Sequence, residues 1–284
     1  MSTQYLSLPD GQIAYDDTGS GPLVICLPSI GDLRSEYRLL VPQLVAAGYR
    51  VVTVDPRGQG ESSVRWPDYS VVGEGADLLA LTRALDAGPA VVIGTSMAAG
   101  AAVWAAAEAP EQFSGLLLVS PILRDMQPRW QSRLMYMLLF APLFSGSWGA
   151  SLWARYLTLL YPSAQPADFN AYLRRLRANL REPGHMAALR AMLYASKRAS
   201  DERLEQATAP ALIVVGTKDM DFHDPAAEAR VIASRLGGKD HQVEVIAGAG
   251  HYPHAEAPER FTPLAIDFLR RIAPTHLGAR DVAG

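Results

Sequence analysis

The stretch AVVIGTSMAAG, residues 90–100, places Ser96 between a run of apolar residues and a run of small ones. The residues before Ser96 are typical of a strand buried on both faces, and those from Met97 onward are typical of a helix. In GTSMAAG, six of the seven residues are Gly, Ala, Ser or Thr. Small neighbours on both sides of one hydroxyl indicate a sharp corner that presents Ser96. A tight packing turn without chemistry would produce the same pattern, so other stretches of the chain must decide.

Short strands alternate with helical patterns on both sides of this corner. The segments YLSL and QIAYDD predict two paired strands joined by the turn Pro9-Asp10-Gly11. Further strands are expected at 22–28, 49–55, 90–94, 114–121, 209–219 and 241–250, and helices at 37–48, 76–88, 97–110, 225–236 and 258–272. This alternation predicts the α/β class, with a mainly parallel central sheet and helices on both faces.

The alternation stops over residues 122–207, which are rich in Leu, Met, Tyr, Trp and Arg and show only helical patterns. Strands on both sides of this segment belong to the same expected sheet. The sequence therefore predicts one core domain, residues 1–121 and 208–284, with an inserted helical cap over 122–207.

Polar residues follow three of the expected strands directly. Ser96 follows AVVIG, Asp219 follows ALIVVGTK and His251 follows QVEVIAGAG. The carboxyl ends of parallel strands collect functional groups at one edge of a sheet. A serine, an acid and a histidine in this chain order match the order found in hydrolases with a nucleophile elbow.

On these residues the chain resembles the α/β-hydrolase fold superfamily, in its serine-nucleophile branch with a cap. GTSMA resembles the G-x-S-x-G elbow, DPRGQGES resembles the segment common after the fourth strand, GTKDMDFHDP resembles the acid loop, and GAGHYPHAEAPE resembles the histidine loop. The resemblance implies Ser96 as nucleophile, His251 as general base and Asp219 as the acid that orients it. Asp125 is the competing acid, because some relatives of this fold carry the acid after the preceding strand.

The resemblance also implies two backbone N–H donors for an oxyanion, those of Met97 and Ile30. The chain departs from the family at both sites. Ala98 replaces the second glycine of the elbow, and Pro28-Ser29 replaces the usual His-Gly pair. We expect either that Gly31 supplies the missing flexibility or that the Ser29 hydroxyl serves as an additional donor.

The expected cap interleaves aromatic residues and methionines, which would give an apolar and adaptable roof over the site. Candidate pocket residues are Ser29, Trp130, Met137, Phe140, Trp153 and Tyr252. A packed underside of the cap explains most of these aromatic residues equally well. Together they favour a small-molecule substrate with a hydrophobic portion.

Composition limits the remaining possibilities. A net charge of -3 and a pI near 6.1 provide no basic surface for nucleic acid. No secretory signal is visible, and the longest apolar stretch, residues 134–144, is too short to span a membrane. The single cysteine, Cys26, fits a reducing compartment, so we expect a cytoplasmic protein, with a homodimer as one option. His251 and His254 have no third ligand nearby, so neither a metal nor another cofactor is expected.

The expected activity is hydrolysis of a carboxylic ester through an acyl-enzyme. The same residues would serve a lactone, thioester or carbon–carbon bond hydrolase, a perhydrolase or an acyltransferase. A serine at position 96 excludes the chemistry of epoxide hydrolases and haloalkane dehalogenases, which use an aspartate there. A binding protein that no longer hydrolyses its ligand is the alternative of another class.

Overall fold

The computed structural model describes residues 3–125 and 148–275. Its centre is a sheet of eight strands in the order β1-β2-β4-β3-β5-β6-β7-β8. The strands are β1 (Gln4–Leu8), β2 (Gly11–Thr18), β3 (Leu23–Leu27), β4 (Arg50–Val54), β5 (Ala90–Thr95), β6 (Phe113–Val119), β7 (Ala211–Gly216) and β8 (His241–Ile246). The β1–β2 and β2–β4 pairs are antiparallel, and every pair from β4 to β8 is parallel. The predicted fold class is confirmed.

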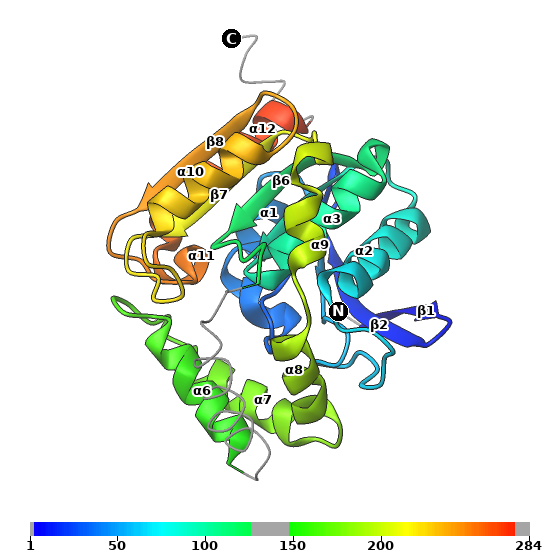
Figure 1. Ribbon diagram of the computed structural model, residues 1–284, viewed down its shortest axis with the longest axis vertical. Coiled ribbons are helices and arrows are strands. Elements are labelled where there is room, and N and C mark those ends of the chain that lie inside the picture. Colours follow the sequence, from blue (N-terminus) through cyan, green and yellow to red (C-terminus); the bar gives the residue numbers. More distant parts are fainter. Residues whose placement is uncertain (1–2, 126–147, 276–284) are drawn as a thin grey trace.

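Helices cover both faces of this sheet (Figure 1). Those of the core are η1 (Arg34–Leu39), α1 (Val41–Ala46), α2 (Val71–Leu85), α3 (Met97–Glu108), η2 (Pro110–Gln112), α10 (Pro225–Arg235), α11 (Pro253–Glu256) and α12 (Pro258–Ile272). Between β6 and β7 the described helices are α6 (Gly149–Leu159), α7 (Phe169–Arg181), α8 (His185–Tyr194), α9 (Arg198–Glu202) and η4 (Leu204–Gln206).

Alternation of side chains along the buried strands divides the core into two clusters. In β3, Leu23 and Ile25 belong to the cluster that includes residues of α2, α3 and α10. Val24 and Cys26 belong to the other cluster, with residues of η1, α1 and α12. Successive side chains of a strand point to opposite faces, so a continuous apolar run supplies both clusters at once.

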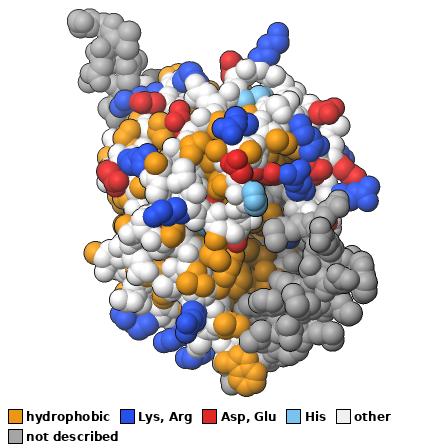
Figure 2. Space-filling view, turned by 60° about the vertical axis from the view of Figure 1, so that its left-hand side comes forward, with side chains coloured by type: hydrophobic (Ala, Val, Ile, Leu, Met, Phe, Trp, Pro, Cys, Tyr) orange, Lys and Arg blue, Asp and Glu red, His pale blue; other side chains and the backbone are white. Residues whose placement is uncertain are grey.

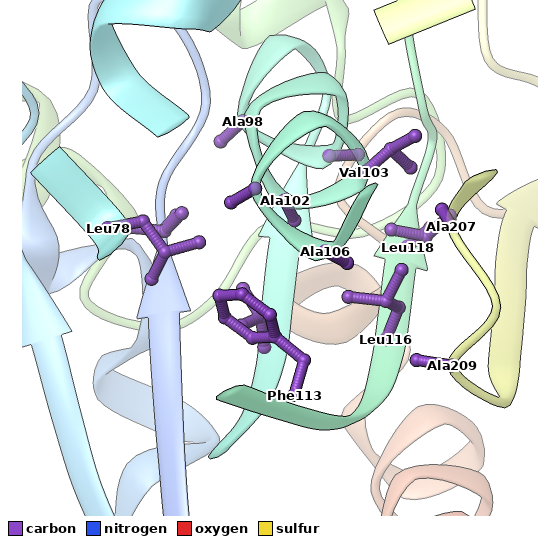
Figure 3. Packing of buried hydrophobic residues seen from close by; sticks show 14 of the residues in the cluster. Leu78, Ala98, Ala102, Val103, Ala106, Phe113, Leu116, Leu118, Ala207 and Ala209 are labelled. Carbon is purple, nitrogen blue, oxygen red and sulfur yellow. The ribbon is translucent and has the colours of Figure 1, made fainter. Parts of the chain in front are cut away.

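Helix α3 packs closely on the sheet because its inner face carries small side chains. Ala98, Ala102 and Ala106 of α3 belong to one core cluster with Leu116 and Leu118 of β6, and Figure 3 shows Ala106 near these leucines. These alanines are at most 1% exposed. Close packing of this kind leaves little room for larger side chains and fixes the start of α3, where Ser96 lies.

The segment 37–48, expected as one helix, forms a 3-10 helix followed by a short α-helix. The 3-10 helix η1 ends at Leu39, and α1 begins at Val41 with Pro42 in its first turn. Proline lacks an N–H and suits the first turn of a helix, so the chain restarts a helix there instead of continuing one.

The helices between β6 and β7 form two groups. Figure 1 shows α6, α7 and α8 together beyond one end of the sheet, whereas α9 lies beside α3. Leu204 and Ala207, close after α9, belong to the core cluster of α2 and α3. A view of one face shows apolar side chains gathered near charged side chains of both signs (Figure 2). Within residues 3–125 and 148–275, no helix has the length and apolar character needed to cross a membrane.

Candidate active site

Ser96 occupies a sharp bend between β5 and α3. Its backbone angles are φ 60° and ψ −120°, a region that residues other than glycine rarely adopt. Its N–H donates to the carbonyl of Val119 in β6 at 2.9 Å. A Cβ at Gly94 would lie 2.9 Å from backbone atoms of Ala98 and Ala99. The bend therefore requires a residue without a Cβ at position 94.

His251 and Asp219 form a buried hydrogen bond at the carboxyl edge of the same sheet. Nδ1 of His251 lies 2.8 Å from Oδ2 of Asp219, and the side chains are 2% and 0% exposed. The other carboxylate oxygen of Asp219 accepts the N–H of Asp221 at 3.1 Å. In the neutral form of His251, with the Nδ1 proton donated to Asp219, Nε2 has a free lone pair that can accept a proton.

A glycine at the end of β7 lets the histidine loop approach the acid loop. A Cβ at Gly216 would lie 2.2 Å from the carbonyl oxygen of Ala249 and 2.3 Å from that of Gly250. The N–H of Lys218 then donates to Ala249 at 2.9 Å. This backbone contact sets the spacing of the two loops that carry Asp219 and His251.

Neighbouring charges shift the pKa values of this pair. Burial disfavours the charged imidazolium, but Asp219, with further contributions from Asp221 and Glu36, raises the pKa of His251 to about 9. Burial would raise the pKa of the Asp219 carboxyl, but His251 and the hydrogen bonds to this carboxylate lower it below its usual value. Asp219 is thus ionised at neutral pH, and the site favours a charged His251.

The loop after β3 forms a tight turn next to the corner. The N–H of Asp32 donates to the carbonyl of Ser29 at 3.1 Å, and Gly31 has φ +68°. Positive φ at the third position of a turn is the requirement of a type II turn, so Gly31 supplies the freedom that Ser29 lacks. Met97 is the first residue of α3, where a backbone N–H has no partner within the helix.

The hydroxyl of Ser29 is engaged with the histidine loop. Its Oγ lies 2.6 Å from the hydroxyl of Tyr252, and both residues are 1% exposed. Trp153 of α6 is also buried and donates from Nε1 to the carbonyl of Gly31 at 3.0 Å. Three candidate pocket residues therefore gather on the turn that carries Ile30. The others, Trp130, Met137 and Phe140, lie outside the described residues.

A buried carboxylate supports this turn from beneath. Oε2 of Glu36, in η1, accepts the N–H of Ser29 at 2.7 Å, and Oε1 lies 3.2 Å from Nε2 of His254. Glu36 and His254 are each 1% exposed, and the His254 ring stacks on Tyr37 with 5.1 Å between ring centroids. His254 is buried because η1 and α11 pack together.

Asp125 lies apart from the buried pair. It is exposed, and its carboxylate accepts the hydroxyl of Ser196 and the N–H of Lys197, each at 2.7 Å. These contacts fix the start of α9. Among the described residues, the carboxylates nearest Nδ1 of His251 are those of Asp219 and Asp221.

A cavity of about 720 Å³ opens beside the corner. It begins at Ile122, whose N–H donates to the carbonyl of Ser96 at 3.1 Å, and it reaches Asp221. Its lining is Ile122, Leu123, Arg124, Asp125, Arg198, Asp201, Asp221, Phe222, His223 and Glu228. The size suits a small organic molecule, and the lining offers both apolar and charged contacts.

Asp219, Asp221 and His251 also offer one possible ligand atom each within 4.8 Å of one another. In this arrangement Nδ1 of His251 already forms its hydrogen bond with Asp219, so a metal ion would have to replace that bond. The geometry therefore suits proton transfer better than metal coordination.

A sequence model of the alpha/beta hydrolase fold family matches residues 22–258. The 2-hydroxy-6-oxo-6-phenylhexa-2,4-dienoate hydrolase of Comamonas testosteroni is 27% identical, with 93% of each chain covered. The Karrikin insensitive 2 receptor IA of Petunia hybrida is 27% identical, with 87% of this chain and 90% of the receptor covered. A thermophilic esterase from Thermogutta terrifontis superposes with a TM-score of 0.77 at 23% identity, covering 96% of this chain and 100% of the esterase.

The parallel sheet, the bend at Ser96 and the family match over most of the chain agree with one another. The family match and the hydrolase relatives support a hydrolase. This chain belongs to the alpha/beta hydrolase fold family.

Proposed function

We propose that Ser96, His251 and Asp219 form the catalytic triad of a serine hydrolase that cleaves a carboxylic ester or a related acyl bond of a small molecule. The observation that carries the proposal is the buried hydrogen bond of His251 to Asp219 at the sheet edge to which β5 delivers Ser96. A serine hydroxyl becomes an effective nucleophile only when a base takes its proton.

In the first step, Oγ of Ser96 attacks the acyl carbon and Nε2 of His251 takes the hydroxyl proton. Asp219 stabilises the imidazolium that forms, and the N–H groups of Met97 and Ile30 bind the developing oxyanion. His251 then protonates the leaving group. In the second step, His251 takes a proton from water, the resulting hydroxide attacks the acyl-enzyme, and Ser96 regains its proton.

The turn at Ile30 is held by three separate contacts, which supports its role as an oxyanion donor. Glu36 binds the N–H of Ser29, Tyr252 binds the Ser29 hydroxyl, and Trp153 binds the carbonyl of Gly31. Donors that are fixed before the reaction stabilise a transition state at little further cost. This arrangement also explains how the chain manages without the usual His-Gly pair.

We further propose that α6, α7 and α8, within the insertion 122–207, act as a cap and that the substrate has a hydrophobic portion. Apolar side chains of α6, α7 and α8 form one cluster with Tyr252 and Ala255, and Ile30 and Leu33 pack against it. The cavity that begins at Ile122 adds charged groups, so the substrate is expected to carry a polar group as well. The protein is expected to act in the cytoplasm, without a cofactor.

The first test is covalent labelling by a fluorophosphonate, followed by mass spectrometry of the labelled peptide. The wild type should be labelled once, at Ser96, and Ser96→Ala should not be labelled and should lose about 10⁴-fold or more in turnover. Labelling of Ser96→Ala at one site with normal stoichiometry would show that another residue is the nucleophile.

The second test is a series of p-nitrophenyl esters of increasing acyl length, with lactones, thioesters and a dienoate diketone in parallel. Each methylene buried contributes up to about 0.8 kcal/mol, or roughly a fourfold rise in kcat/KM, until the pocket is full. A steady decline from the acetyl ester onward would contradict a hydrophobic acyl pocket. Faster cleavage of the diketone than of any ester would favour carbon–carbon bond hydrolysis over ester hydrolysis.

The Petunia relative is named a receptor, which favours a second candidate, a ligand-binding protein that turns over slowly or not at all. Ligand binding measured by calorimetry on Ser96→Ala distinguishes the two. The receptor is favoured if Ser96→Ala binds a ligand tightly and the wild type is labelled by the fluorophosphonate but turns over no substrate class.

A further inference from the structure

A second carboxylate lies beside the histidine. Oδ2 of Asp221 is 3.5 Å from Nδ1 of His251, the same nitrogen that is bonded to Asp219 at 2.8 Å. The Asp221 side chain is 20% exposed, so its charge is only partly screened by water. The chemistry of the triad requires only one carboxylate at this nitrogen, so the presence of Asp221 as a second carboxylate needs an explanation.

The position of Asp221 is fixed from the inserted helices. The hydroxyl of Tyr156, in α6, donates to Oδ1 of Asp221 at 2.7 Å. Tyr156 in turn lies against Trp153, with 5.2 Å between ring centroids. The carboxylate is therefore held with one oxygen on α6 and the other toward His251.

The end of α6 contacts the histidine a second time, through the backbone. The N–H of His251 donates to the carbonyl of Leu160, which caps α6, at 3.1 Å. A Cβ at Gly250 would lie 2.4 Å from that carbonyl oxygen and 2.3 Å from Cδ of Pro162. Only a glycine permits this approach, so the histidine loop is built to receive the end of α6.

We propose that Asp221 is a positioning residue: its carboxylate, held by Tyr156 of α6, is a second negative partner of His251 and links the inserted helices to the reacting histidine. The proposal rests on the proposed function, because it acts through His251. The negative charge stabilises the imidazolium that forms as Ser96 attacks. It also contributes to the raised pKa of His251, together with Asp219, on the same loop as Asp221, and Glu36 of η1.

The experiment compares Asp221→Asn, Tyr156→Phe and the double variant with the wild type. The control is Asp224→Asn in the same loop, because the Asp224 carboxylate instead caps α10 through the N–H of Ala227 at 2.9 Å. Asparagine is an equally good cap, so this control should retain the fold. The measurements are the fluorophosphonate labelling rate at Ser96 and the kcat and KM of an ester substrate, each from pH 6 to 10.

Loss of the Asp221 charge should lower the pKa of His251, so that its neutral form is present at lower pH. The rising limb of the labelling profile should shift down by about one pH unit in Asp221→Asn, and the limiting rate should fall several-fold. Tyr156→Phe should shift the limb in the same direction by less. The double variant should match Asp221→Asn, because the tyrosine acts through the carboxylate.

The possible outcomes separate the two proposals. A wild type that is not labelled at Ser96 would overturn the proposed function. If the wild type is labelled at Ser96 and both Asp221→Asn and Asp224→Asn keep its pH profile, the role of Asp221 is overturned but the proposed function is not. A raised KM with an unchanged profile would show that Asp221 binds substrate in the cavity instead, which also overturns the positioning role. If Asp221→Asn fails to fold, the Tyr156→Phe profile decides.

Discussion

The backbone strain at Ser96 predicts an unusual order of stability for two inactive variants. Ser96→Ala and Ser96→Gly both remove the hydroxyl, so the difference between them isolates the backbone. At φ 60° and ψ −120° a residue with a Cβ is outside even the left-handed region, and strain of this kind costs up to about 3 kcal/mol. Glycine does not bear this cost, because it has no Cβ to collide with the neighbouring peptide groups.

Two effects reduce the stability advantage of glycine over alanine at position 96. Glycine loses more backbone freedom on folding, which costs about 0.5–1 kcal/mol relative to alanine. Ser96 is 2% exposed, so removal of the alanine methyl also forfeits about 0.8 kcal/mol of burial. The net result is that Ser96→Gly should be more stable than Ser96→Ala by about 1 kcal/mol, taking the strain near the upper end of its range.

The assay is equilibrium unfolding in urea followed by circular dichroism, with both variants measured side by side. Ser234 near the end of α10 provides the control, because it is exposed and lies in regular helix. There the order should reverse, with Ser234→Gly less stable than Ser234→Ala by about 0.5–1 kcal/mol. Equal stabilities at position 96, or a glycine variant weaker than the alanine variant, would refute the strain argument.

Three further predictions concern the charged groups. Asp219→Asn should fold normally but lose about 10⁴-fold in kcat, because the amide favours the wrong tautomer of His251. In Asp125→Asn, kcat should stay within about twofold, although KM can change because Asp125 lines the cavity; a crippled kcat in Asp125→Asn would reassign the acid. The labelling rate should rise about tenfold per pH unit from pH 6 to 8, because the pKa of His251 is raised to about 9; a plateau below pH 7.5 would contradict it. Burial and, to a lesser extent, the charge of Glu36 raise the pKa of Asp32 to about 8 in the folded protein. The unfolded chain loses the Asp32 carboxyl proton at lower pH than the folded chain does, so the free energy of unfolding falls as pH rises from about 4 to 8. Asp32→Asn should escape this loss and gain on the order of 1–3 kcal/mol over the wild type between pH 5 and 7.5 in urea unfolding; a pH-independent difference would show that Asp32 ionises normally.

Much of the core could be predicted because its signals are local. The buried strands are continuous apolar runs, and the bend at Ser96 is visible as a cluster of small residues around one hydroxyl. Asp219 and His251 could be chosen because each directly follows the end of a predicted strand. The exact ends of the strands depend on contacts with distant segments as well as on local sequence. Strand β7, for example, stops at Gly216, where the carbonyls of the histidine loop approach.

Contacts between distant segments could not be predicted. Nothing in the periodicity of α6 indicates that Tyr156 reaches Asp221, which lies 65 residues further along the chain. The single helix expected over 37–48 is wrong for a local reason, because the proline at position 42 starts a new helix. The choice of Trp153 as a pocket residue stays a prediction, although the structure places it on the turn that carries Ile30.

The buried carboxyl groups of Asp32 and Glu36 beside that turn show why such contacts matter for function. Asp32 and Glu36 are both within 1% of complete burial, and a buried carboxylate costs free energy unless its partners compensate. An apolar residue at either position would pack more cheaply, so stability alone does not account for them. Glu36 binds the N–H of Ser29, one residue before Ile30, and Asp32 receives the hydroxyl of Tyr172 from α7. The chain thus accepts a cost in stability where two buried carboxyl groups fix the turn of the proposed oxyanion donor, as is common where a local rule of folding is broken at a functional site.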